Sequence, residues 1–136
     1  MRLLAPRAWR VPVFVLAVIV TILLLAESLP SAVAGLVRST AGMTRLDGLT
    51  RLGLLEGRRQ WVVLALGAVH LAGTAGVITG IWVPVAGVAG AGIEAVVFGW
   101  VLSRQVGAGD RGRALGAYTL FLVLALAVVA VDAARL

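Results

Sequence analysis

The sequence predicts an all-α fold, an integral membrane four-helix bundle with a short interfacial helix between helices one and two. Four apolar runs fill most of the 136 residues, at about 11–29, 61–83, 85–102 and 115–131. A hydrocarbon core of about 30 Å needs about 20 apolar residues in a helix, so each run is long enough to cross it. The hydrophobic fraction of 61% and the mean hydropathy of +1.06 exclude an ordinary soluble domain. Tryptophan side chains prefer the headgroup level, and here they mark the ends of the runs, at Trp9, Trp61, Trp82 and Trp100.

The rest of the composition limits the chemistry. Four spans leave no room for an extramembrane domain, so residues 1–136 are expected to form a single transmembrane domain. The absence of cysteine excludes disulfides, thiol catalysis and thiolate metal sites. All 12 basic residues are arginines, and the net charge is +6. They lie in tails and loops, where they meet lipid phosphates, so we expect a lipid bilayer and no nucleic acid as partner.

The first run follows a basic tail and carries Pro12 in its first turn, where the missing N–H costs little. Glu27, Ser28 and Pro30 are expected to end this helix. A cleaved signal peptide is the alternative, because Ala32-Val33-Ala34 matches a small-x-small cleavage pattern. The run is longer than a usual signal core and is followed by more membrane protein, which favours a retained helix.

Residues 31–60 form the longest connection, and its pattern is amphipathic. Leucines and valines are spaced near helical repeats, at Val33, Leu36, Val37, Leu46, Leu49, Leu52 and Leu55. Arginines lie between them, at Arg38, Arg45, Arg51, Arg58 and Arg59. This pattern predicts a short helix lying in the membrane interface. Gly42, Gly48, Gly53 and Gly57 are expected to break it into pieces.

The second and third runs meet at Pro84 and predict an antiparallel hairpin with almost no loop. Residues 103–113 are glycine-rich and charged, which predicts a solvated loop, and Asp132 and Arg135 are expected to end the chain in water. Four spans place both termini on one side. The arginine count favours cytoplasmic loops, whereas the basic flank of the first helix favours the opposite orientation.

Small residues predict how the helices pack, because close backbone approach replaces the hydrophobic effect in lipid. The expected packing positions are Gly67, Gly73, Gly76 and Gly80 in the second run and Gly87 and Gly90 in the third. The hairpin should therefore be the tight half of the bundle, and the fourth helix should face lipid. The G-x-x-x-G formed by Gly76 and Gly80 could instead serve a homo-oligomer.

His70 and Glu94 are ionisable groups near the middle of neighbouring helices, where charge is expensive. They lie 14 and 10 residues from Pro84, which corresponds to a depth difference of roughly 6 Å. With Thr74, one turn from His70, they could hold a quinone carbonyl or relay a proton. The alternative is a polar clasp between two helices.

The remaining polar residues suggest less. Glu27 is expected to snorkel to the interface, and Thr79 and Tyr118 to serve packing or the aromatic belt. No enzyme motif, metal site or phosphate-binding loop is present in the sequence, so the chain is not expected to be an enzyme on its own.

The segment A-L-G-A-V-H-L-A-G-T-A-G-V-I-T-G-I-W-V-P, residues 65–84, resembles the DoxX-like family of small four-helix membrane proteins. Gly67, Leu71, Gly73, Gly76 and Gly80 match the family's small-residue pattern, whereas His70 stands where the family usually has glutamate. The resemblance implies a multi-pass protein of a bacterial inner membrane. Some relatives are small subunits of thiosulfate:quinone oxidoreductase, and others are associated with redox defence or assist membrane-protein assembly.

The first functional hypothesis is an accessory subunit that supports a redox or quinone-linked membrane process, with another membrane protein or an oxidoreductase subunit as its partner. The second is a non-catalytic scaffold or assembly factor that uses the glycine-rich faces. The third is a carrier of protons or small solutes. The sequence does not specify a cofactor, although a quinone fits the first hypothesis.

Overall fold

The computed structural model describes residues 10–136, and within this range the fold consists of helices without strands. The helices are α1 (Arg10–Leu36), α2 (Thr40–Thr50), α3 (Gln60–Thr79), α4 (Pro84–Gly107) and α5 (Arg113–Ala133). Four of them, all except α2, are long and apolar enough to cross a membrane. The predicted fold class is therefore confirmed. The basic tail and Trp9 lie outside the described residues.

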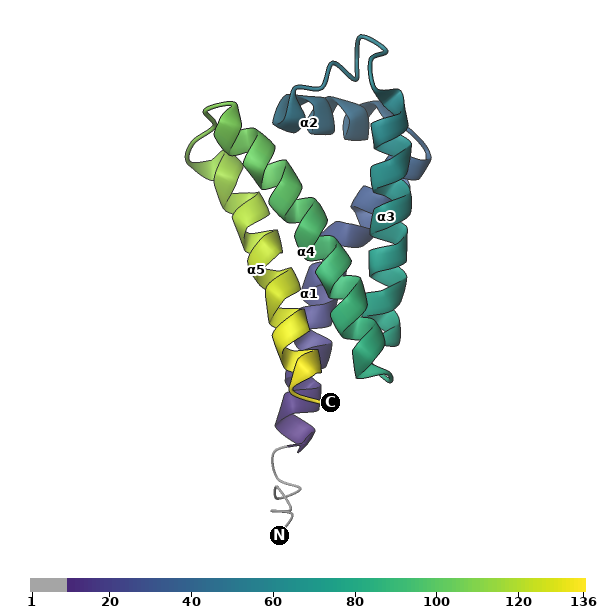
Figure 1. Ribbon diagram of the computed structural model, residues 1–136, viewed down its shortest axis with the longest axis vertical. Coiled ribbons are helices and arrows are strands. Elements are labelled where there is room, and N and C mark those ends of the chain that lie inside the picture. Colours follow the sequence, from purple (N-terminus) through teal and green to yellow (C-terminus); the bar gives the residue numbers. More distant parts are fainter. Residues whose placement is uncertain (1–9) are drawn as a thin grey trace.

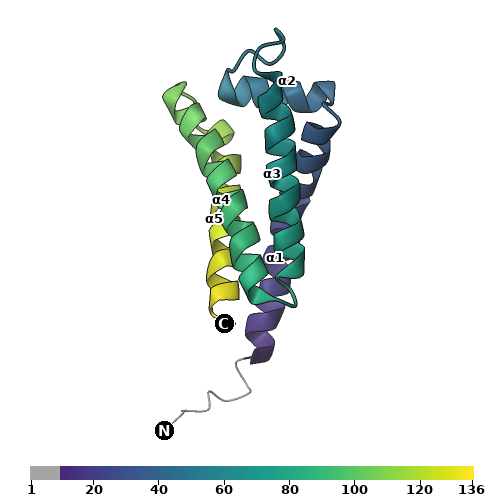
Figure 2. The same ribbon diagram turned by 45° about the vertical axis from the view of Figure 1, so that its right-hand side comes forward.

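The four long helices stand side by side and α2 lies across one end of them (Figures 1 and 2). α1 contacts α3 and α5, and α4 contacts the same two helices from the other side, which closes the bundle. We call the end near α2 the loop end and the opposite end the terminal end. The start of α1, the α3–α4 turn and the C-terminus all lie at the terminal end (Figure 1).

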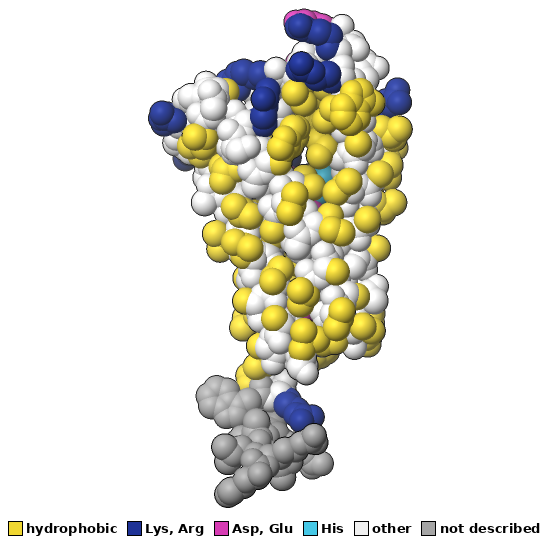
Figure 3. All heavy atoms as spheres, viewed as in Figure 1, with side chains coloured by type: hydrophobic (Ala, Val, Ile, Leu, Met, Phe, Trp, Pro, Cys, Tyr) yellow, Lys and Arg dark blue, Asp and Glu magenta, His cyan; other side chains and the backbone are white. Residues whose placement is uncertain are grey.

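The surface agrees with a membrane-spanning bundle. Apolar side chains cover the length of the helices, and arginines gather at the loop end (Figure 3). The long helices expose large apolar side chains such as Ile22, Leu71, Val96 and Leu126. Lipid is the solvent that suits such a surface.

α1 is longer than predicted. The expectation that Glu27, Ser28 and Pro30 end the first helix is wrong, because α1 continues to Leu36 with Pro30 inside it. Proline interrupts one backbone hydrogen bond, but transmembrane helices tolerate it when neighbouring groups compensate. The extra turns bring Gly35 against α3, where an added β-carbon would lie 2.7 Å from Gly67 Cα.

The interfacial helix is present as α2, but its bounds are narrower than the predicted pattern. Ser39 caps its N-terminus by accepting a hydrogen bond from the N–H of Gly42. It ends at Thr50, and Arg51, which caps the C-terminus, has a left-handed conformation. Gly42 and Gly48 lie inside α2 and do not break it, whereas Gly53 and Gly57 have positive φ in the loop that follows.

The hairpin differs from its prediction in the turn and in the length of α4. α3 ends at Thr79, so residues 80–83 form the turn and Pro84 opens α4 at a position that suits proline. The solvated loop expected over 103–113 is wrong for its first half, because α4 continues to Gly107. Gln105 in this half is fully buried and donates to the carbonyl of Ala114 in α5.

Glycines allow close contact between helices at two crossings. An added β-carbon on Gly76 would lie 2.7 Å from Gly90 Cα, and one on Gly67 would lie 2.8 Å from Leu36 N. The α3–α4 and α1–α3 crossings are therefore as close as backbone contact allows. The small residues of α3 therefore contact other helices of the same chain.

Candidate functional site

The two central ionisable side chains meet across the α3–α4 seam. His70 Nδ1 lies 2.6 Å from Glu94 Oε2. His70 is 7% exposed and Glu94 is fully buried. The side chains bridge the depth difference expected from their positions relative to Pro84. A pair with so little exposure has lost most of its contact with solvent, so each group depends on the other for its polar interactions.

Neighbouring residues fix the orientation of this pair. Thr74, one turn from His70 on α3, donates to Glu94 Oε1 at 3.5 Å. Gly73 provides the space for the carboxylate, because a side chain there would collide with it. Phe98, one turn beyond Glu94, holds the imidazole from the side, with 5.5 Å between the ring centroids. All three residues proposed as the intramembrane polar site are thus brought together.

The geometry sets what the pair can do chemically. Nδ1 faces the carboxylate, which is an acceptor when ionised, so Nε2 is the nitrogen left for another molecule. A neutral imidazole accepts a hydrogen bond at Nε2, and an imidazolium donates one there. Nε2 is therefore the atom through which the pair can donate a hydrogen bond to a bound group or accept one from it.

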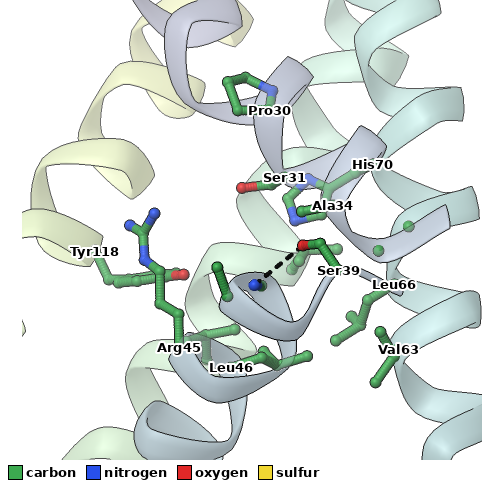
Figure 4. A pocket seen from close by; sticks show the side chains of 16 residues that line it. Pro30, Ser31, Ala34, Ser39, Arg45, Leu46, Val63, Leu66, His70 and Tyr118 are labelled. Atoms are coloured by element: carbon green, nitrogen blue, oxygen red, sulfur yellow. Dashed lines mark hydrogen bonds between the residues drawn. The ribbon is translucent and has the colours of Figure 1, made fainter. Parts of the chain in front are cut away.

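His70 also forms part of the wall of a cavity of about 280 Å³. The cavity lies between α2 and the long helices, in the half of the bundle nearer the loop end. Its polar lining comes from Ser31, Ser39, Arg45, His70 and Tyr118. Figure 4 shows Arg45 and Tyr118 on one side of this space, with His70 and Ser31 across it. Figure 3 shows a hollow in the surface with a histidine side chain inside it.

An ion pair joins α1 and α2 beside the cavity. Arg45 Nη2 lies 3.1 Å from Glu27 Oε1, and the guanidinium lies 5.9 Å from the centroid of the Tyr118 ring. Glu27 also accepts a hydrogen bond from Ser31. The sequence-based interpretation of Glu27 as a snorkelling residue missed this partner. The sequence contained a signal for this ion pair, namely an acidic residue late in an apolar helix, followed by an arginine in an amphipathic segment.

Tyr118 belongs to the packed interior, as the sequence-based interpretation allowed. It is 8% exposed, and its ring packs edge-on against Phe98 and Phe121. Phe98 also contacts His70, so its phenyl ring lies between two residues that line the cavity, Tyr118 and His70. Thr79 is exposed and bonds only to the carbonyl of Ala75 in its own helix.

A second polar cluster lies at the terminal end. The expectation that Asp132 and Arg135 lie in water is wrong: Asp132 is 2% exposed, and its Oδ1 accepts from Arg135 Nη1 at 2.6 Å. Arg135 also donates to the carbonyls of Gly80 and Ile81 in the α3–α4 turn. Gly80 and Gly87 leave the space that the carboxylate fills. Gly80 and Gly87 therefore serve helix packing and also accommodate the Asp132 carboxylate. The spacing of the glycines did not indicate this second role.

The described residues contain no group of three or more histidine, aspartate or glutamate side chains placed to hold a metal ion. Comparisons with known proteins add no assignment: no family model, no curated protein and no solved structure matches the chain.

Proposed function

We propose that this chain is an accessory membrane protein of the DoxX-like type that supports a redox or quinone-linked process in a bacterial inner membrane. In this proposal His70 and Glu94 form an intramembrane site that hydrogen-bonds the head group of a quinone and exchanges a proton with it. The chain acts beside an oxidoreductase subunit and carries out no redox step of its own.

The observation that carries the proposal is a combination of two features of His70. Its Nδ1 is engaged by Glu94, and the same side chain forms part of the wall of a cavity in the membrane-spanning bundle. A polar clasp that only joins two helices needs the first of these features but not the second. A quinone carbonyl accepts a hydrogen bond from an imidazolium, and a quinol hydroxyl donates one to a neutral imidazole.

The glycine-rich faces give less support to a scaffold. Gly67, Gly76, Gly80 and Gly90 approach backbone atoms of neighbouring helices in this chain, so these faces are occupied. A partner that needed them would have to displace an internal helix. An accessory subunit can instead contact its partner through the lipid-facing side chains, which remain exposed.

Purification from the native membrane tests the proposal. The wild-type protein and the variants His70→Gln and Glu94→Gln are extracted in mild detergent, and bound quinone is quantified by chromatography. We expect quinone in the wild-type sample and about tenfold less in each variant, the effect of losing one hydrogen bond to a partly charged group. Thr79→Val is the matched control, because Thr79 lies on the same helix and contacts neither the pair nor the cavity.

Two results would contradict the proposal. One is a wild-type protein without quinone, combined with unchanged quinone reduction in membranes of the His70→Gln strain. The other is a stoichiometric membrane partner that survives His70→Gln but is lost in Gly76→Leu, which would favour the scaffold.

A further inference from the structure

The cavity beside His70 adjoins a groove on the outer surface of α1. The groove is lined by Leu29, Pro30, Val33, Ala34, Val37 and Ser39. Three of these residues, Pro30, Ala34 and Ser39, also line the cavity. Leu29 and Val33 are half exposed on a transmembrane helix, where their surroundings are lipid. Cavity and groove therefore make a hollow that is polar inside and apolar where it meets the bilayer.

The charges around the polar part are already paired. Arg45 is bound to Glu27 at 3.1 Å, and Glu94 is bound to His70 at 2.6 Å. An ionic head group would lose its hydration and would add an unpaired charge to the hollow, and both effects are unfavourable at membrane depth. A neutral head group can use Nε2 of His70 and the hydroxyls of Ser31 and Tyr118 while the pairs stay intact.

We propose that this hollow binds a neutral single-chain amphiphile, which enters sideways from the bilayer between α1 and α2. Its hydroxyl or carbonyl head lies in the cavity beside His70, and its apolar chain lies in the groove along Leu29, Val33 and Val37. One chain suffices because the groove follows one face of one helix. The inference rests on the proposed function for the contact between the head group and His70. An isoprenoid quinol and a monoacylglycerol share this chemistry.

Photolabelling of the full chain in phosphatidylcholine liposomes tests the inference. The probe is hexadecanol with a diazirine in its chain and a terminal alkyne for enrichment. We expect the label, mapped by mass spectrometry, to concentrate on residues 29–37. The control probe is hexadecanoate with the same diazirine at alkaline pH, where it is ionised. It should label this segment about tenfold less, because the neutral head avoids the cost of an unpaired charge.

A matched pair of variants tests the groove. Val33→Trp fills it, whereas Ile22→Trp places the same indole ring on the lipid-facing surface of α1 outside it. The two positions are similarly exposed, at 53% and 59%, so both variants should fold. Val33→Trp should reduce labelling of 29–37 about tenfold, since displacing two buried methylene groups has an effect of that size. Ile22→Trp should leave labelling unchanged.

Competition identifies the source of the ligand. Displacement of the label by decylubiquinol indicates a quinol, and displacement by monoolein alone indicates a glyceride; either supports the inference. Four results would overturn the inference. The label could spread evenly over the lipid-facing helices, or it could concentrate on Leu64 of α3 and Val96 of α4. The carboxylate probe could label equally, or neither competitor could displace the label. Groove labelling, with no bound quinone in native extracts and unchanged quinone reduction in membranes of the His70→Gln strain, refutes the proposed function alone. Quinone bound through His70 with evenly spread label refutes this inference alone.

Discussion

The carboxylate of Glu94 occupies the space that a side chain on Gly73 would need. Its Oε1 oxygen lies 2.6 Å from the position of a β-carbon built on Gly73, closer than real β-carbons approach other atoms. The glycine on α3 therefore provides the space in which the acid on α4 lies. The position of the His70–Glu94 pair depends on the absence of a methyl group on the facing helix.

Gly73→Ala should displace the Glu94 carboxylate from His70 and lower the free energy of unfolding by about 1–3 kcal/mol, the range for over-packed sites. Gly92→Ala is the control, because an added β-carbon there meets nothing within 4 Å. Unfolding by sodium dodecyl sulfate in mixed micelles measures both variants. Equal stability of the two variants would show that the carboxylate can move without loss.

The crossing of α3 and α4 at Gly90 should be still less tolerant. A β-carbon on Gly90 would lie 2.5 Å from Val77 N and 2.6 Å from Gly73 O, which are backbone atoms that cannot rotate away. We expect Gly90→Ala to force the helices apart and to destabilise the protein by about 3 kcal/mol, at the upper end of the over-packing range. Gly116→Ala on α5, where the space is open, should be neutral. The same detergent titration compares them, and a neutral Gly90→Ala would contradict the close crossing.

The number and type of the spanning helices could be predicted from the sequence because hydropathy reports directly on the solvent. The positions of His70 and Glu94 relative to Pro84 likewise placed both groups at similar depth. The end of α1 could not be predicted, because Pro30 breaks soluble helices but is tolerated inside a membrane-spanning one. Turn propensities calibrated in water mislead at such positions.

The cavity and the terminal cluster depend on contacts between distant segments. Glu27 and Arg45 are 18 positions apart, and Arg135 reaches Gly80, which is 55 positions away. The partners of each pair lie in or next to different helices of the fold, so no local pattern predicts them. Asp132, so near the C-terminus, looks like a solvated residue in the sequence and is buried only because Gly80 and Gly87 leave space for it.

The Asp132–Arg135 pair should show a compensating double mutant. Arg135→Ala leaves a buried carboxylate and the carbonyls of Gly80 and Ile81 without their donor, and we expect a loss of about 3–5 kcal/mol, typical when one partner of a buried pair is removed. Adding Asp132→Ala removes the unpaired charge, so the double variant should be more stable than Arg135→Ala alone. Detergent unfolding of both variants measures this. A double variant that is the less stable of the two would show that the carboxylate itself holds the terminal end.

Asp47 should make the stability of the C-terminal end of α2 depend on pH. Its Oδ1 accepts the N–H of Leu54 at 2.9 Å, and this hydrogen bond lowers the pKa of the carboxyl below its usual range. A lowered pKa in the folded state means that the stabilisation is complete above the usual carboxyl pKa of about 4 and is lost as the pH falls through the folded value. We expect proteolysis after α2 to accelerate below about pH 4 in the wild type. Asp47→Asn should abolish that step, whereas Glu56→Gln in the same loop should keep it.

The coupling between His70 and Glu94 measures what their contact contributes to the stability of the α3–α4 seam. His70→Ala leaves the buried carboxylate without its nearest partner, which should destabilise the protein by about 3–5 kcal/mol if the acid stays charged. His70→Ala with Glu94→Gln removes the charge as well, so the double variant should recover part of the loss. A double-mutant cycle in detergent gives the coupling energy, expected at about 1–3 kcal/mol. A coupling near zero would mean that the 2.6 Å contact contributes nothing to stability. A large coupling would show that the imidazole and the carboxylate stabilise each other across the α3–α4 seam.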